Sequence, residues 1–596
     1  MELKNYYKGS LWALALRCLC AFVMLLPLRV AWEIGAGLET GNFIVDNLSK
    51  FANQFYRDGL ADAFIFAALF LLLGWVRSHE DRLDVPALLL AVCFALLYVI
   101  GNVCIYVGSF SFFFANLYQL CLTALLLLGL SMLFYCLIRL FYRFVEKAAP
   151  EKEQISHPLL KGAGIIFLCW LPWLLMNYPA SLCPDATSQI YQWLGIIPWS
   201  AHHPPFSTLI MSLCISLGEF IWNRNFGLFL YVLFQSATGA FIFSYMLMLL
   251  HEMGLSRKGR ILMLLFFASP FWALFAQWFE KDFLYAQVFA LCICFMLPVI
   301  KSRRCSLKDA LRIAAAALAA ILLRKTGTYE LVPALLLLGL WLKKRDRLRM
   351  LLAVLAVVLL SQAVNNGLYP AMGIEKASAR EALSIPFQQT ARYVNQFPDE
   401  VTAEERAAID AVLVYDELYK YDPQVSDPVK NNYRENGAAL PEYFKVWFQM
   451  LLKHPVCYFE AGFMQSFGYL APVQPMMDAY ILSTYYPGLE DIGIYRVFGD
   501  FPTRAFDSLR HMFANFPLTN MLCMAGTYTW LLLLCLVQLL RKKHFGQLIL
   551  LLPFCMNVLI CIASPLAAST RYELPVIACA PIMLGLMLIA SKESEH

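Results

Sequence analysis

The sequence predicts an all-α polytopic membrane protein, a helical bundle of about fourteen spans with a mostly helical extracytoplasmic region. Three observations lead to this fold class. Hydrophobic residues make up 60% of the chain and charged residues only 15%, and the mean hydropathy is +0.60. A soluble protein of 596 residues could not cover its surface with so few charges. Apolar runs long enough to cross a bilayer also recur along most of the chain.

These runs divide the chain into four segments. Accessory spans are expected over residues 1–159, a transmembrane core over 160–369, an extracytoplasmic region over 370–520 and closing spans over 521–596. The first run, Leu11–Trp32, is expected to be an uncleaved span, because it is long and lacks a convincing small-residue cleavage site. The other apolar runs are Ala61–Val76, Val85–Tyr106, Phe114–Phe141, Leu160–Asn177, Phe206–Trp222, Phe226–Leu250, Ile261–Trp278, Phe283–Ile300, Ala310–Leu323, Leu331–Leu342, Leu351–Tyr369, Met521–Leu540, Leu548–Cys561 and Leu574–Ala590.

Lysine and arginine set the expected orientation, because connections rich in them face the cytoplasm. The cytoplasmic connections on this rule are Arg77–Arg82, Arg139–Lys161, Arg257–Arg260, Lys301–Lys308, Lys343–Arg349 and Arg541–His544. The outer segments are then Glu33–Asp62, Ser181–His203, Glu280–Asp282 and Pro370–Asn520. Both termini are expected in the cytoplasm, and the protein in the cell membrane.

One apolar run conflicts with this alternation. If Phe206–Trp222 crossed the membrane, the basic connection Arg257–Arg260 and every later loop would be inverted. We therefore expect a re-entrant or interfacial helix, opened by Pro204 and Pro205, since proline suits the first turn of a helix. Irregular backbone at membrane depth is tolerated where protein surrounds it.

Composition also excludes several classes of site. Most of the 18 cysteines lie inside apolar runs, where they act as small hydrophobic residues, and neither a CxxC pair nor a Cys/His metal spacing stands out. A basic stripe with interleaved aromatics is missing, so a nucleic-acid partner is not expected. The outer region carries many aromatics and an acidic, helix-like stretch, Ala403–Tyr419.

The residues suited to chemistry gather in the predicted outer loops. The first large core loop, residues 178–206, holds one acid, Asp185, and the pair His202 and His203, but no lysine or arginine. The other outer loops contribute Glu280, Lys281, Asp282, Arg324, Lys325 and Arg571. Carboxylates can act as a general base or hold a divalent cation, and arginine and lysine can bind a phosphate. Acids and cations beside lipid therefore suggest chemistry on a lipid-linked phosphate.

Each of these residues also has a purely structural interpretation. Asp185 could cap a helix, since Pro-Asp before Ala-Thr-Ser-Gln is a reasonable helix start. His202 and His203 could be interfacial polar residues, and Glu280 with Asp282 could form a plain polar turn. The side chains of Arg324, Lys325 and Arg571 could extend to lipid head groups, although cations are unusual on the outer side.

The order of the motifs resembles the GT-C superfamily of membrane glycosyltransferases. Asp185, in the loop after the first core span, matches the family's essential acid, and His202–Pro205 matches its later Pro-Pro motif. The Ser-Pro at Ser269, within a span that precedes Asp282, is similar to the next outer loop of the family. Arg571 and Tyr572 resemble the C-terminal RY-x-x-P helix of protein mannosyltransferase-like and arabinose-transferase-like members. The resemblance covers roughly residue 160 onward.

The resemblance implies a glycosyltransferase that takes a sugar from a polyprenyl-phosphate-linked donor and passes it to an extracytoplasmic glycan, lipid or protein. Asp185 would be the base, with Asp282 or Glu280 assisting or, like Asp185, binding a divalent cation such as Mg²⁺ or Mn²⁺. His202, His203, Lys281, Arg324, Lys325, Arg571 and Tyr572 would bind substrate. The sequence departs from the family in having Ala186 rather than a second acid after Asp185, which argues against a two-acid metal site in that loop.

Two other functions remain open from the sequence. A transporter or flippase of lipid-linked glycans needs polar groups along a path through the bundle. The later spans contain few charges, and the acids gather at one surface, which disfavours transport. A non-catalytic membrane scaffold would tolerate replacement of Asp185.

Overall fold

The computed structural model describes residues 2–35, 37, 39–79, 82–147, 158–473, 486–499, 501, 504–505, 508, 512 and 516–593. Contacts between these residues separate two compact units, each assembled from distant parts of the chain. The first unit contains residues 1–147, 384–474 and 565–567, and the second contains 148–383, 475–564 and 568–596. The four-segment organisation given above remains a prediction.

Helices form both units, and in the described ranges extended backbone pairs only as isolated bridges. The first unit consists of α1 (Glu2–Leu25), α2 (Phe43–Asn53), α3 (Gly59–His79), α4 (Val85–Tyr106), α5 (Ser111–Phe114), α6 (Leu117–Lys147), α18 (Ser384–Gln396), α19 (Ala403–Asp410), α20 (Asp427–Lys430), α21 (Leu440–Lys453), α22 (Pro455–Met464) and α23 (Phe467–Leu470).

A buried ion pair holds the polar part of the first unit together. Arg392 on α18 and Glu460 on α22 lie 2.5 Å apart, with side chains 5% and 6% exposed. Glu460 also accepts a hydrogen bond from the backbone N–H of Phe110, and Arg392 donates to the carbonyl of Gly108. The pair therefore fixes the turn after α4 against α18 and α22, and its hydrogen bonds offset the cost of burying two charges.

The acidic stretch Ala403–Tyr419 is not one helix, contrary to the prediction. Thr402 and Glu405 form a capping box at the start of α19, which ends at Asp410. Val412 and Leu413 are then fully buried, and Leu413 pairs with Tyr433 through an isolated bridge. Burial of these two apolar side chains by tertiary contacts outweighs the local helix preference.

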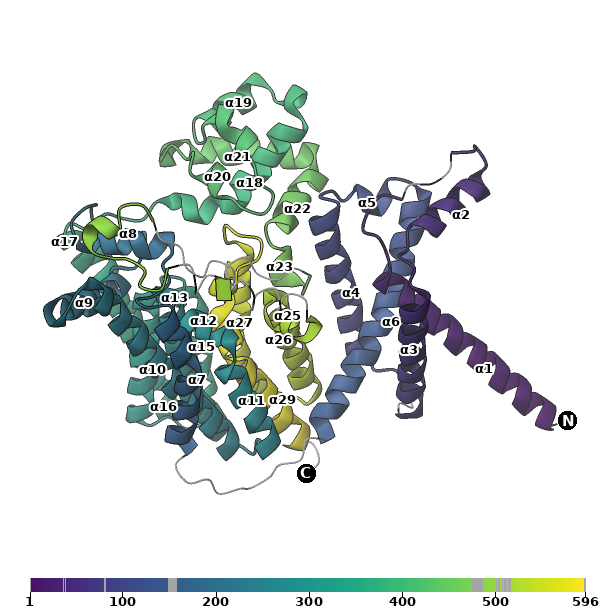
Figure 1. Ribbon diagram of the computed structural model, residues 1–596, viewed down its shortest axis with the longest axis horizontal. Helices are drawn as coiled ribbons and strands as arrows, with labels where there is room; N and C mark the ends of the chain where they lie inside the picture. Colours follow the sequence, from purple (N-terminus) through teal and green to yellow (C-terminus); the bar gives the residue numbers. More distant parts are fainter. Residues whose placement is uncertain are drawn as a thin grey trace. The chain divides into compact units, whose positions relative to one another are not determined.

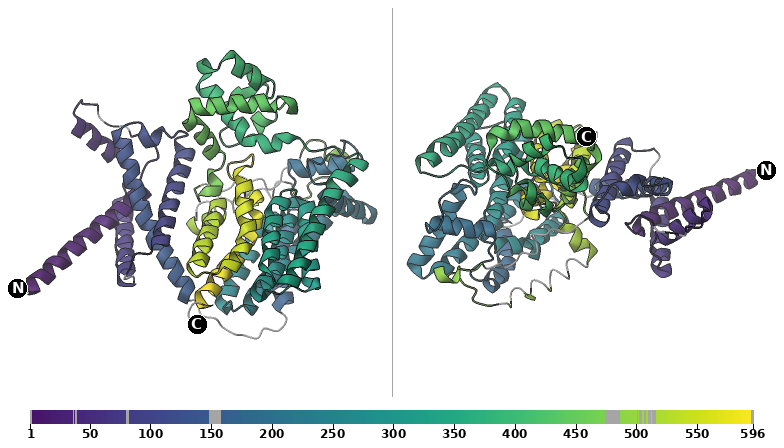
Figure 2. Two further views of the ribbon diagram at one scale, coloured as in Figure 1. Left: turned by 180° about the vertical axis from the view of Figure 1, so that it is seen from behind. Right: turned by 90° about the horizontal axis from the view of Figure 1, so that it is seen from above.

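The second unit is a bundle around α13 (Lys281–Ser302), which contacts α10, α14, α27 and α28. The C-terminal helices run beside the middle helices of the chain in Figure 1 and in the reverse view of Figure 2. The remaining helices are α7 (Pro158–Met176), α8 (Pro184–Trp193), α9 (Pro205–Ile221), α10 (Arg224–Glu252), α11 (Arg257–Ala268), α12 (Pro270–Ala276), α14 (Leu307–Leu323), α15 (Gly327–Trp341), α16 (Lys344–Ala363), α17 (Tyr369–Ala371), α25 (Pro517–Leu522), α26 (Ala525–Arg541), α27 (Phe545–Ile562), α28 (Thr570–Ala578) and α29 (Ala580–Glu593).

Ten helices in the described part of the chain are long and apolar enough to cross a membrane. The number becomes eleven if α11 and α12, which meet at 44° where Ser269 precedes Pro270, form one crossing. This confirms an all-α, multi-pass membrane protein. The count of about fourteen spans by the twenty-residue rule and the cytoplasmic position of both termini remain predictions.

The helix expected to be re-entrant is α9, which is among the shorter apolar helices. It begins at Pro205, as predicted, and ends at Ile221. The chain then turns back within a few residues into α10, whose N-cap is Asn223. A Cβ atom on Gly218 would lie only 2.1 Å from the backbone of Gly227, so two glycines allow the helices to pack closely. Whether α9 crosses the membrane remains a prediction.

Candidate functional site

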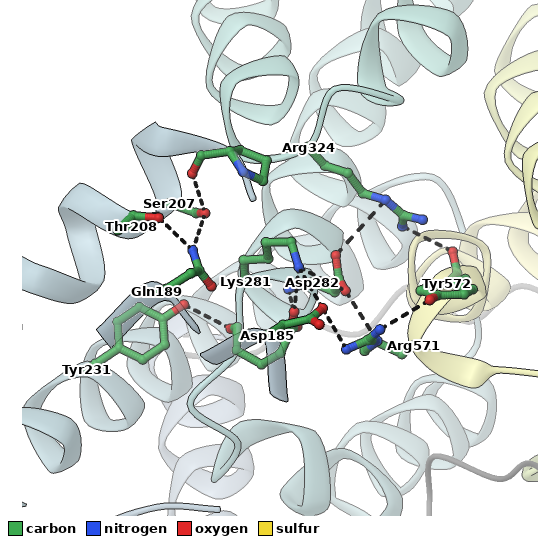
Figure 3. Close-up of polar contacts among 12 residues, drawn as sticks. Asp185, Gln189, Ser207, Thr208, Tyr231, Lys281, Asp282, Arg324, Arg571 and Tyr572 are labelled. Atoms are coloured by element: carbon green, nitrogen blue, oxygen red, sulfur yellow. Dashed lines mark hydrogen bonds and ion pairs between the residues drawn. The ribbon is translucent and has the colours of Figure 1, made fainter. Parts of the chain in front are cut away.

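Four segments that are distant in sequence meet at one end of the second unit (Figure 3). They are the first turn of α8, the start of α13, the connection between α14 and α15, and the first turn of α28. Backbone pairing aligns the first two, because Ser181 forms a parallel bridge with Trp278. Ser181 donates to the carbonyl of Gln277, and Phe279 donates to that of Ser181. The loops that carry Asp185 and Glu280 are therefore held in a fixed relation.

Asp185 lies in the first turn of α8 but does not cap it. The N-cap is Cys183, which makes no side-chain capping bond, and Pro184 occupies the first turn, as is common in helices. The Asp185 carboxylate instead contacts Lys281 at 3.4 Å and Arg571 at 3.2 Å. The Asp185 side chain therefore makes tertiary ion pairs and does not serve as a helix cap.

Lys281 stands among all three acids of the site. Its ammonium lies 2.9 Å from Glu280, 3.4 Å from Asp185 and 3.8 Å from Asp282. Glu280 also has a structural role, because its side chain caps α13 by accepting a hydrogen bond from the backbone N–H of Asp282. The plain polar turn that the sequence left as an alternative is therefore a helix cap, and Glu280 also contacts the central cation, Lys281.

Asp282 is the acid that binds the most cations. Its carboxylate lies 3.5 Å from Arg571, 3.8 Å from Lys281 and 4.0 Å from Arg324. The side chain is only 4% exposed. An acid so enclosed is suited to holding cations in place, and it is poorly placed to meet a substrate.

Arg324 and Arg571 enter the site from different helices and meet at Tyr572. Arg324 donates to the backbone carbonyl of Tyr572 at 3.2 Å, and Arg571 donates to its phenolic oxygen at 3.2 Å. Both guanidinium groups also lie over the ring, at 5.6 and 5.1 Å from its centre. Tyr572 thereby fixes the spacing of two cations that were predicted to bind a phosphate.

The three acids differ in exposure and in proton affinity. The side chain of Asp185 is 28% exposed, whereas that of Glu280 is 2% exposed. Burial alone would raise the pKa of Asp185, but Arg571 and then Lys281 outweigh it and hold that pKa well below its usual range. Burial and then the Asp282 carboxylate raise the pKa of Glu280 above its usual range. Asp185 is therefore the ionised acid that a substrate can reach.

The histidine pair and Lys325 form a neighbouring group. The rings of His202 and His203 are 4.6 Å apart, and His203 is buried. Burial and then the Lys281 ammonium lower the pKa of His203 to about 3, so it is neutral at physiological pH. Lys325 donates to the carbonyl of Ala201 at 2.5 Å, so it holds the loop that carries the histidines. Lys325 therefore lies beside the acid cluster, whereas Arg324 contacts an acid within it.

Several buried polar residues around the site were not predicted. Tyr285 donates to Glu330 at 2.7 Å, and Thr529 donates to Glu573 at 3.2 Å. Tyr231 donates to the carbonyl of Glu280 at 2.9 Å. Glu330 and Glu573 are fully buried on helices that carry few charges. A lone acid in an apolar helix was the available signal, because such residues are expensive to bury and usually functional.

The position that a divalent cation would take among the acids holds the Lys281 ammonium. Among the described residues, no group of three or more His, Cys, Asp and Glu side chains is placed to hold a metal ion. The sequence left Asp185 and Asp282 open as ligands of a divalent cation. In the structure their carboxylate oxygens contact Lys281, Arg324 and Arg571. The arrangement fits a site in which protein cations balance the acids.

Comparisons with known proteins give one match. A family model described as a family of unknown function (DUF6020) matches residues 198–596. Neither the curated proteins nor the solved structures contain a significant match to the chain. The matched range includes Glu280, Lys281, Asp282, Arg324 and Arg571, whereas Asp185 precedes it.

Proposed function

The chain belongs to the DUF6020 family of unknown function, and we propose that it is a membrane glycosyltransferase with a GT-C-like site. Its donor is a sugar linked to a polyprenyl phosphate, and its acceptor is a hydroxyl group of an extracytoplasmic glycan, lipid or protein. One observation carries the proposal: an accessible carboxylate, Asp185, lies between two cations, Lys281 and Arg571, at the end of a membrane bundle.

The transfer step assigns one role to each group. The acceptor oxygen attacks the anomeric carbon of the donor while its proton passes to the Asp185 carboxylate. The bond between that carbon and the phosphate oxygen breaks, and the polyprenyl phosphate leaves with the bonding electrons. Arg571 and Arg324 stabilise the negative charge that grows on the leaving phosphate. Tyr572 keeps the two guanidinium groups apart at a fixed spacing.

The resting ion pairs leave Asp185 a weak base, since its pKa lies far below neutral pH. A bound donor changes this balance. Its phosphate competes for Arg571 and Lys281, and each contact withdrawn from Asp185 raises the proton affinity of the carboxylate. Donor binding thus prepares the base, and in this scheme the acceptor is activated only when the donor is present.

Asp282 and Glu280 act as positioning residues in this scheme. Both are nearly inaccessible, and both contact Lys281. Because the Lys281 ammonium already bridges the three acids, we derive no step through a divalent cation. His202 and His203 lie in the same loop as Asp185. His202 is the exposed member of the pair, and its ring can donate a hydrogen bond to a sugar hydroxyl or accept one from it.

The test combines a catalytic and a binding measurement. Asp185→Asn is nearly isosteric, and loss of a general base costs about 10²–10⁴-fold in rate. We expect the variant to insert and purify normally but fail to restore the missing outer glycan in a deletion strain. Arg571→Gln is expected to bind polyprenyl phosphate roughly ten- to a hundredfold more weakly, since a charge-assisted contact contributes about 1.5–3 kcal/mol.

Two matched variants control for charge. Asp416→Asn removes an acid that is 83% exposed, and Arg224→Gln removes a cation paired with Glu219 in the second unit. Both are expected to keep full function. Complete rescue by well-expressed Asp185→Asn would remove the base from the proposal. Unchanged lipid-phosphate affinity in Arg571→Gln would remove the donor site.

A further inference from the structure

A second cationic site lies at the opposite end of the bundle from Asp185. A cavity of about 250 Å³ opens where α13, α15, α27 and α29 meet. Lys281 lies in the first turn of α13 and Lys301 in its last, so about 30 Å of helix separates the two sites. Figure 1 shows α13, α15, α27 and α29, the helices that meet at the cavity. The cavity therefore cannot belong to the site already described.

The lining of this cavity is cationic and apolar. Lys301, Arg303, Lys543 and His544 line the cavity, and the lining residues include neither aspartate nor glutamate. The rest of the lining is mainly apolar, from Met253, Leu297, Ile300, Phe545, Leu586 and Ile589. Cations beside aliphatic side chains suit a ligand that carries a phosphate next to an apolar part.

Two of the cations occupy strained backbone. Arg303 has a φ of 52° and Lys543 a φ of 59°, in the left-handed region that favours glycine. Among the described residues, only one other non-glycine residue, Glu435, has a positive φ. Arg303 is the C-cap of α13, and Lys543 follows Lys542, the C-cap of α26. Glycine is the usual residue where the chain leaves a helix in this conformation. A long cationic side chain at each position costs backbone strain, and a site that uses the two side chains would account for this cost.

Three further features of the cavity favour the binding of an anion. The Arg303 guanidinium lies 4.2 Å from the centre of the Trp341 ring, which fixes its direction. In the described part of the protein, the buried indole N–H of Trp341 finds no acceptor. The first turn of α27, an 18-residue helix, also lines the cavity at Phe545, Gly546 and Gln547, and helix N-termini attract anions.

We propose that this cavity binds a phosphate-bearing anion, with Arg303 and Lys543 as its principal contacts. Connections rich in lysine and arginine meet at this end of the bundle, which is expected to face the cytoplasm. The phosphate can come from the headgroup of an anionic lipid or from free phosphate. This site stands apart from the glycosyltransferase proposal and does not depend on it.

The experiment uses the full chain, purified in detergent, with native mass spectrometry to count bound molecules. The probes are phosphatidylglycerol, phosphatidylcholine and inorganic phosphate. Arg303→Gly with Lys543→Gly removes both cations and relieves the strained backbone, so the double variant is expected to fold at least as well as the natural chain. Lys344→Gln with Arg345→Gln removes two exposed cations from the same end outside the cavity.

We expect one phosphatidylglycerol to remain bound to the natural chain and to the control variant, and about tenfold or more weaker binding in the glycine variant. Phosphatidylcholine is expected to bind both chains equally. Displacement of the lipid by millimolar inorganic phosphate, or binding of phosphate itself with the same loss in the glycine variant, identifies free phosphate as the ligand. Equal binding of every probe to the natural chain and the glycine variant would overturn the proposal.

Discussion

The contrast between two acids of the site gives the sharpest prediction. Asp282 contacts three cations, at 3.5, 3.8 and 4.0 Å, and is 4% exposed. Asp282→Asn removes the charge that these buried cations share. Breaking a buried ion pair on one side typically costs about 3–5 kcal/mol, because an uncompensated charge stays behind. We therefore expect Asp282→Asn to be strongly destabilised.

Asp185→Asn is expected to behave differently. Asp185 is 28% exposed, and its two cations keep other partners, since Arg571 and Lys281 both contact Asp282. The loss then resembles that of a partly exposed pair, about 1 kcal/mol. The difference between the variants is therefore about 2–4 kcal/mol, from substitutions of the same chemical type.

Thermal unfolding in detergent, followed by size-exclusion chromatography of heated samples, measures this difference without any substrate. Asp416→Asn, at an 83% exposed position, sets the baseline for the substitution. We expect the loss of Tm in Asp282→Asn to be at least twice that in Asp185→Asn. Equal losses would refute the assignment of Asp282 as the residue that holds the cations and Asp185 as the one that meets the substrate.

Three further predictions concern metal, pH and topology. Because Lys281 occupies the centre of the acids, we expect EDTA to leave sugar transfer unchanged, and a chelator-sensitive activity that Mg²⁺ restores would contradict this. The folded pKa of His203 is about 3, below its usual value. The unfolded chain therefore binds one more proton than the folded chain between about pH 6.5 and 3, and stability falls as the pH is lowered through this range. His203→Gln is expected to reduce the dependence of Tm on pH in this range, and an unchanged dependence would contradict the prediction. If α9 is re-entrant, a cysteine at position 224 reacts with an impermeant reagent from outside, whereas one at 257 is protected, in a chain whose native cysteines are replaced; protection at 224 would show that α9 crosses.

Hydropathy predicted the helices well, because burial in lipid imposes helical backbone wherever an apolar run is long enough. The run Val85–Tyr106 has the same bounds as α4. The prediction failed over Ala403–Tyr419, where the chain leaves the helix at Asp410. There the deciding contact joins Leu413 to Tyr433, and local sequence carries little information about such a pairing.

The site was predicted only in outline, for a similar reason. Charge on the expected outer side identified Arg324 and Lys325 together, yet only Arg324 reaches the acids. The backbone of Arg324 is extended, with φ −150° and ψ 123°, and neighbours on extended backbone point to opposite sides. Glu330 was missed because its partner, Tyr285, is 45 positions away and joins it only in the folded bundle.

The contact between Asp185 and Arg571 has a consequence for biosynthesis. Their separation is 386 positions, so at about 5–20 residues per second roughly 20–80 seconds pass between the synthesis of one and of the other. Until Arg571 is made, Asp282 can pair with Lys281 and Arg324 but lacks Arg571, its closest cation. A chain that ends before Arg571 has the three acids Asp185, Glu280 and Asp282 but only two cations, Lys281 and Arg324, so Arg571 is the residue that completes the ion pairs of the site.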